Sequence, residues 1–139
     1  MTRRSRAREV ALQLLVQRDA NPGVPRPAID KFVKDRLRDP ALVTFSTALY
    51  DTVLQHISEI DVKLTAAAEN WRLIRMAAVD RNVLRLGACE LLHPVEETPA
   101  VVALDEAIEL ARRYGAKDSP AFVNGVLDKI NKSRGATVA

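Results

Sequence analysis

The sequence predicts an all-α fold, and three observations lead to this prediction. Hydrophobic residues make up 47% of the 139-residue chain, which is enough for a real core and too many for a disordered polypeptide. Aromatic residues make up only 4%, so the core is aliphatic, a composition that favours helices over a sandwich or barrel. Proline and glycine cluster at a few positions and leave long apolar stretches between them. The length fits one domain, or two small halves that share a core.

The first helix is expected to begin close to the N-terminus. Its small and aliphatic side chains recur at the spacing of one helical stripe, at Ala7, Val10, Ala11, Leu14 and Leu15. A loop follows at 21–27, because three prolines and one glycine fall within it. Between residues 41 and 93 the chain has no proline and a single glycine, so this stretch is expected to be mostly helical, in two or three pieces.

The segment 79–92 predicts a central, buried helix, because apolar residues cover most of its circumference. Arg85 and Glu90 lie within it and need partners if they are buried, so we expect ion pairs with other helices. Gly87 in mid-helix costs about 1 kcal/mol relative to alanine. The close approach of a neighbouring helix is the simplest compensation for that cost.

Two more helices are marked by their ends. Thr98 is expected to cap the first of them, with Pro99 at its first position. Gly115 is the expected C-terminal cap, and Ser119 followed by Pro120 repeats the start signal for the last helix. The sequence thus predicts about seven helices and no convincing strand.

The N-terminus is the densest cluster of positive charge in a chain whose net charge is only +3. Four of the first eight residues are arginines: Arg3, Arg4, Arg6 and Arg8. A guanidinium suits phosphate, and a helix that already fixes the backbone lowers the entropy cost of binding. Cations at a helix N-terminus also oppose the helix dipole, a cost that a polyanion relieves. This pattern predicts a nucleic-acid contact, and a solvated, solubilising N-terminus is the alternative.

The connection at 114–120 is a second candidate for RNA contact. It holds Tyr114, Lys117 and Asp118, and Phe122 follows in the next helix. A base stacked on Tyr114 or Phe122 would contribute about 1–3 kcal/mol, and nearby helix N–H groups suit a phosphate. The alternative interpretation places Phe122 in the core and assigns the other residues to turn chemistry.

No catalytic, cofactor or metal site is predicted. His56 and His93 lack a His or Cys partner at the spacing of a zinc site. The single cysteine, Cys89, lies in the apolar helix and is expected to be a core residue. No apolar run approaches the ~20 residues that cross a bilayer, so the chain is expected to be soluble and cytoplasmic.

Four segments of the chain resemble the NusB family of transcription antitermination proteins: RARE at 6–9, VDRNVLRL at 79–86, DEAIELAR at 105–112 and DSPAFVNGVLDK at 118–129. They correspond to the family's first helix, its central helix and its closing motifs, and Trp71 before the central helix also fits. The likeness covers essentially the whole chain. It is strongest from Trp71 onward and weakest over 21–60.

The resemblance implies a single all-helical RNA-binding domain without cofactor or catalysis, built of two packed bundles at about 1–70 and 71–134. It implies binding to the boxA element of nascent ribosomal RNA within the transcription elongation complex, together with NusE, a small-subunit ribosomal protein. RNA contact carries over to these positions: Arg3, Arg4, Arg6, Arg8, Tyr114, Lys117, Asp118 and Phe122. Partner contact carries over to Asp80 and Arg81.

The chain departs from the family at two positions, since Val16 and Cys89 stand where aromatic residues are common. The loss of an aromatic at Val16 removes a stacking surface near the arginines. A protein-interaction module with weak or no RNA binding of its own is therefore the alternative function. An RNA-recognition domain of a ribosomal RNA methyltransferase and a helix-turn-helix DNA binder have less support, and homodimer formation stays open.

Overall fold

The computed structural model describes residues 2–69 and 72–136, with side chains to Arg134, and Trp71 lies outside this part. Within it the chain forms seven α-helices, one short 3-10 helix and no strand, which confirms the all-α prediction. The elements in chain order are α1 (Arg3–Ala20), α2 (Arg26–Leu37), α3 (Pro40–Gln55), α4 (Ile57–Ala68), η1 (Leu73–Arg75), α5 (Ala78–Leu92), α6 (Ala100–Tyr114) and α7 (Ser119–Ala136).

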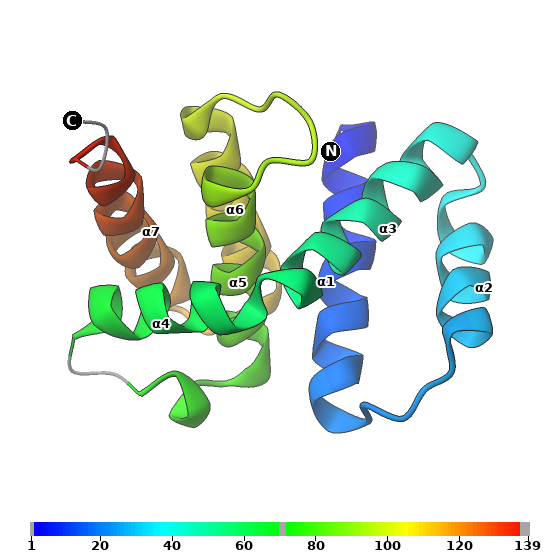
Figure 1. Cartoon of the computed structure of the whole chain (residues 1–139), viewed down its shortest axis with the longest axis horizontal. Helices are drawn as coiled ribbons and strands as arrows, with labels where there is room; N and C mark the ends of the chain where they lie inside the picture. The colour runs from blue at the N-terminus through cyan, green and yellow to red at the C-terminus, as the bar shows by residue number, and fades with distance from the viewer. Residues whose placement is uncertain (1, 70–71, 137–139) are drawn as a thin grey trace.

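Helix α5 lies at the centre of the fold, as predicted (Figure 1). It packs against α1 and α3 on one side and against α4, α6 and α7 on the other. All ten residues from Asn82 to Leu91 are buried, which is why this helix is apolar around most of its circumference. Helix α2 lies at the far edge and packs against α1 and α3.

Helix α4 packs mainly with the C-terminal helices, although the sequence places the boundary between the two bundles near residue 70. The buried residues of α4 are Ile60, Leu64 and Ala68. The helix packs mainly on α5 and α7, with few contacts to α3. Lys129 on α7 also donates a 3.3 Å hydrogen bond to the carbonyl of Ala67. The division between the two groups of helices therefore falls near residue 56.

Gly87 permits the close approach that the sequence predicts. A Cβ atom there would lie 2.5 Å from Leu127 Cδ1 on α7 and 3.1 Å from Ala107 Cβ on α6. Both neighbours are buried, so neither has free space to move into. The hydrogen side chain of Gly87 is therefore what lets three helices meet.

The helix ends around α6 follow the prediction in part. Gly115 caps α6, and its N–H donates to the carbonyl of Ala111 at 2.9 Å. The N-cap is Pro99, without a side-chain hydrogen bond, so Thr98 does not cap this helix. Ser119 is the first residue of α7 rather than its N-cap. Its hydroxyl accepts a hydrogen bond from the N–H of Ala116 at 2.9 Å.

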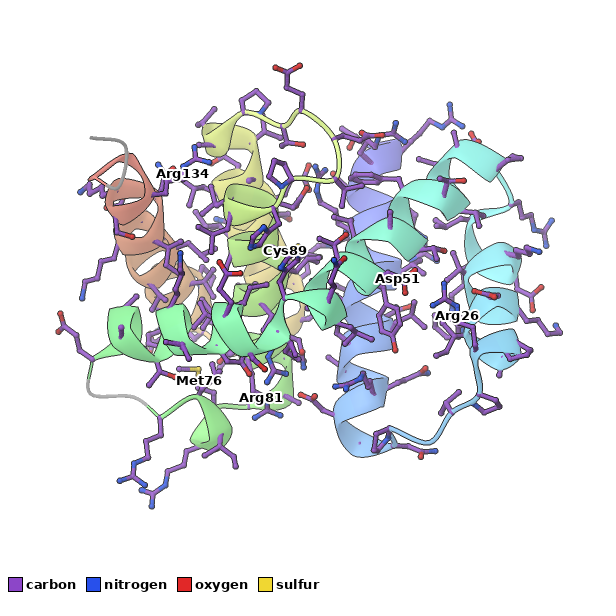
Figure 2. All side chains as sticks on the ribbon, in the orientation of Figure 1. Arg26, Asp51, Met76, Arg81, Cys89 and Arg134 are labelled. Atoms are coloured by element: carbon purple, nitrogen blue, oxygen red, sulfur yellow. The ribbon has the colours of Figure 1, made fainter. Side chains whose placement is uncertain are left out.

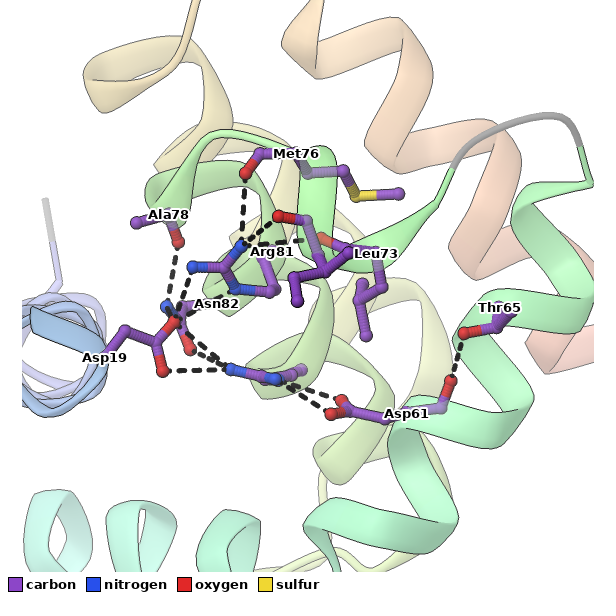
Figure 3. Close-up of polar contacts among 10 residues, drawn as sticks. Asp19, Asp61, Thr65, Leu73, Met76, Ala78, Arg81 and Asn82 are labelled. Atoms are coloured by element: carbon purple, nitrogen blue, oxygen red, sulfur yellow. Dashed lines mark hydrogen bonds and ion pairs between the residues drawn. The ribbon is translucent and has the colours of Figure 1, made fainter. Parts of the chain in front are cut away.

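Arg85 and its partners form a polar network between α1, α4 and α5 (Figure 3). The guanidinium donates two 2.8 Å hydrogen bonds to the carboxylate of Asp61 on α4. It also lies 3.3 Å from both oxygens of Asp19 on α1. This confirms the predicted ion pairing of Arg85.

The same carboxylate, Asp19, binds two more side chains of α5. Arg81 donates to it at 2.9 and 3.0 Å, and Asn82 donates at 2.8 Å. Burial is the largest single influence on the pKa of Asp19 and acts to raise it. The hydrogen bonds from Asn82 and Arg81, with the charges of Arg85 and Arg81, together outweigh burial and hold that pKa below its usual value.

Two further contacts join the outer helices to their neighbours (Figure 2). Arg26 on α2 and Asp51 on α3 face each other, with hydrogen bonds of 2.7 and 2.9 Å. Arg134 on α7 donates a 2.6 Å hydrogen bond to the carbonyl of Leu91 at the end of α5. Both contacts link elements that are separated in sequence.

We expect Gly87→Ala to destabilise the protein by about 1–3 kcal/mol, because the added methyl group overlaps Leu127 in a packed interior. Gly125→Ala is the matched control. It is also a helical glycine, but a Cβ there meets nothing within 4 Å, so helix propensity predicts a gain of about 0.5–1 kcal/mol. Urea unfolding of both variants measures the difference, and equal effects would refute the close approach at Gly87.

We expect Asp19→Asn to lower the free energy of unfolding at pH 7 by about 2–3 kcal/mol, because Arg81 and Arg85 lose a charged acceptor. The folded pKa of Asp19 lies below its ordinary 3.8. Its contribution is therefore complete above that ordinary value and is lost as pH falls through the folded pKa.

Urea unfolding across pH 7 to 3 tests this. The D19N variant should lose less stability on acidification than the wild type. Asp105→Asn is the control, because Asp105 is exposed on α6, and it should change stability by less than about 0.5 kcal/mol. Parallel pH curves for D19N and the wild type would contradict the role of Asp19.

Candidate nucleic-acid interface

Three of the four N-terminal arginines lie on the surface of α1. The helix begins with an N-cap at Thr2, whose hydroxyl accepts from the N–H of Ser5 at 3.0 Å. The side chains of Arg3, Arg4 and Arg6 are 75%, 40% and 39% exposed. No acidic residue lies in the first turn, so their charge adds to the positive end of the helix dipole.

Each of these exposed arginines contacts one carboxylate: Arg3 with Asp39, Arg4 with Glu96 and Arg6 with Glu9. Ion pairs at the surface contribute only about 0–1 kcal/mol each. A phosphate group can therefore compete for the surface pairs of Arg3 and Arg4 at small cost. Arg4 is also held in place by Phe45, whose ring centroid lies 4.7 Å from the guanidinium carbon.

Arg8 is only 4% exposed, which leaves little of its guanidinium for the RNA contact that the sequence predicts. Its guanidinium donates three hydrogen bonds of 2.9 to 3.1 Å to the carboxylate of Glu90 on α5. The reason is helical periodicity, since Arg8 shares the inward face of α1 with the buried Leu12 and Leu15. The same contact confirms the predicted ion pair of Glu90.

Glu9 joins the start of α1 to the end of α6. This carboxylate is only 6% exposed and contacts Arg6, Arg113 and Tyr114. Burial, and then the hydrogen bond to Glu9, raises the pKa of the Tyr114 hydroxyl. Tyr114 is 41% exposed, and Arg6 and Tyr114 contact the same carboxylate.

A groove of about 400 Å³ continues from Tyr114 along α1. Val16 lies in this groove together with Phe32 and Arg36 of α2, which the sequence did not predict as site residues. Phe32 lines it with its ring stacked under Arg36, whose guanidinium carbon lies 3.5 Å from the ring centroid. The groove thus retains aromatic surface from Phe32 and Tyr114 although Val16 is aliphatic. Only the fold reveals this, because α2 reaches the groove through tertiary packing.

A second pocket, of about 290 Å³, lies at the start of α5 and α7. It brings together three predicted site residues, Asp80, Asp118 and Phe122. Asp80 Oδ1 is buried and has no hydrogen-bond partner in the described part of the chain. Such an atom is costly to leave unpaired inside the protein. Lys117 is exposed on the adjoining turn and does not line this pocket.

Arg81 is engaged within the chain, and its contact with a partner stays a prediction. Besides its bonds to Asp19, it donates to the carbonyls of Leu73, Ile74 and Met76 at 3.2 to 3.4 Å. It therefore holds η1 against α5. Its side chain is 15% exposed, which leaves little of it for other contacts.

The remaining reactive residues give no sign of catalysis. Burial, with a smaller influence of Glu90, raises the pKa of Cys89 to about 12, so the thiol stays protonated, as expected of a core residue. His56 and His93, which are far apart in sequence, lie against each other with ring centroids 3.7 Å apart. None of the described helices is long and apolar enough to cross a membrane.

Comparison with known proteins agrees with this geometry. The model of the NusB family matches residues 5–132. The chain is 44% identical over 135 residues to the transcription antitermination protein NusB of Sorangium cellulosum, covering 97% of this chain and 96% of the relative. It is 45% identical over 130 residues to the NusB of Anaeromyxobacter dehalogenans, covering 93% and 90%.

Solved structures show the same fold. The NusB structure from T. maritima has a TM-score of 0.81 at 34% identity, covering 95% of this chain and 92% of that one. A crystal structure of the antitermination factors NusB and NusE in complex with double-stranded RNA has a TM-score of 0.84 at 28% identity, covering 96% and 98%. As the sequence predicts, these relatives are antitermination factors rather than enzymes. The chain belongs to the NusB family of transcription antitermination proteins.

Proposed function

We propose that this protein binds the boxA element of nascent ribosomal RNA together with NusE, and so acts in antitermination on the transcription elongation complex in the cytoplasm. Family membership supports the proposal, as does the related NusB chain that was crystallised with NusE and RNA. The observation on which it chiefly rests is the group of exposed arginines at the start of α1, of which Arg6 shares the carboxylate of Glu9 with the exposed Tyr114.

The chemistry of this surface suits single-stranded RNA. Arg3, Arg4 and Arg6 supply charge for the backbone, and the exposed carboxylate partners of Arg3 and Arg4 are weak competitors for it. Tyr114 supplies an exposed ring on which an unpaired base can stack, and Phe32 adds apolar surface to the groove. Sequence-specific proteins usually read RNA where bases are unpaired. Arg8 acts instead as a structural ion pair beneath this surface.

The pocket at Asp80 is the proposed contact with NusE. Its unpaired carboxylate oxygen requires a donor, and Phe122 provides apolar surface beside it. The groove along α1 and the pocket each include a residue from the start of α5, Val79 in the groove and Asp80 in the pocket. RNA and NusE would thus lie side by side, and their binding would be mutually supportive. Self-association of this chain stays a prediction.

A protein-interaction module with little RNA affinity of its own is the second candidate. Two observations favour it: the aliphatic Val16 in the groove, and the carboxylate partner of every N-terminal arginine. Mixing the chain with NusE, with and without a boxA oligonucleotide, separates the two. An unchanged protein complex with no RNA contribution would support the module.

We expect the affinity for a boxA oligonucleotide to fall with salt at a slope of about −2 in log K against log salt, because three arginines neutralise three phosphates. Replacing Arg3, Arg4 and Arg6 by alanine should remove most of this dependence. The matched control replaces three exposed cations at α2 and its C-cap, namely Lys31, Lys34 and Arg38. Fluorescence anisotropy over a salt series gives both slopes. If both triple variants lost RNA affinity equally, binding would depend on general positive charge and not on a site at the N-terminal arginines.

We expect Asp80→Ala to weaken NusE binding by about tenfold or more, since the partner loses a buried acceptor. Binding of RNA to the isolated chain should change little. Asp105→Ala, at an exposed carboxylate of α6, is the control. Isothermal titration with purified NusE measures the effect, and undiminished affinity in D80A would place the NusE surface elsewhere.

A further inference from the structure

His56, Glu59 and His93 form a cluster where three helix ends meet. His56 is both the C-cap of α3 and the N-cap of α4, and Glu59 lies in the first turn of α4. His93 is the C-cap of α5. The backbone is therefore fixed at all three positions. None of these residues lines the groove or the pocket of the candidate interface.

The geometry brings three metal-ligating groups within reach of one another. His93 Nε2 lies 3.0 Å from Glu59 Oε2, and His56 Nδ1 lies 3.6 Å from the same oxygen. The imidazole rings are stacked, with an angle of 7° between their planes. One ligand atom from each residue lies within 4.8 Å of the others, and no second such group exists among the residues described.

Two imidazoles and one carboxylate are a ligand set that Zn²⁺ prefers, with a water as the fourth ligand. The side chains of His56, Glu59 and His93 are 28%, 43% and 27% exposed, so an ion and its water can reach them. The stacked rings need a rotation about their side-chain bonds to bring both lone pairs onto one ion. Lys63, 3.7 Å from Glu59, is 46% exposed and free to turn toward solvent.

We propose that His56, Glu59 and His93 form a binding site for Zn²⁺, completed by one water. The ion would tie the α3–α4 junction to the C-terminal end of α5. The site joins residues 37 positions apart, which is why sequence spacing gives no zinc motif. A purely hydrogen-bonded contact between α4 and α5, without affinity for metal, is the competing account.

Titration of the full-length chain, without a polyhistidine tag, with zinc chloride tests the proposal by calorimetry. We expect saturable binding of one ion per chain. At a free zinc concentration of ten times Kd, the melting temperature should rise by about 5 °C. His93→Ala should weaken binding by about tenfold or more and remove the rise in melting temperature.

Three further variants make the result decisive. Glu59→Gln removes an exposed ligand with little risk to folding, and it should weaken zinc binding as His93→Ala does. Glu97→Gln changes an exposed carboxylate outside the cluster and should bind like the wild type. Cys89→Ala should also bind like the wild type, because the thiol is fully buried. Absence of stoichiometric binding, or equal affinity in E59Q and E97Q, would overturn the proposal.

Discussion

The neutralisation of charges buried on α5 is the constraint on which the rest of the structure depends. Five other helices pack around α5, so Glu90 and Arg85 cannot reach bulk water and must find partners. Arg8 from α1 binds Glu90, while Asp19 and Asp61 from α1 and α4 bind Arg85. Such pairs add little net stability compared with an apolar core, but an unpaired member is very costly. They therefore select one register of α1 and α4 against α5.

This constraint explains why four similar arginines have different roles. The composition of the N-terminus indicates an anion-binding surface, but it does not say which guanidinium faces outward. Arg8 falls on the same stripe as Leu12 and is drawn into the core by Glu90. Arg4 lies one turn earlier on the same side of α1, and its guanidinium also lies over the ring of Phe45, but it is 40% exposed and pairs with the exposed Glu96. Position along the helix, together with the position of a distant carboxylate, decides the outcome.

Local signals in the sequence predict much of the fold, including the buried α5 and the approach at Gly87. They fail where the answer depends on contacts between distant residues. Nothing near α4 in sequence says that it packs on α7 rather than on the N-terminal helices. In the same way, Phe32 enters the candidate interface and His56 meets His93 only through tertiary packing. Spacing rules detect sites within one element, and these are assembled from several.

The buried network also shapes the surface that we propose for NusE. Arg81 does not touch that surface, yet it fixes the carbonyl of Met76, and Met76 and Asp80 line the pocket. Because Asp19 holds Arg81 in turn, a carboxylate on α1 determines the wall of a pocket at the start of α5. A pocket whose walls are fixed before binding loses less conformational entropy on complex formation. The ion pairs that set the helix register thereby also preorganise the partner site.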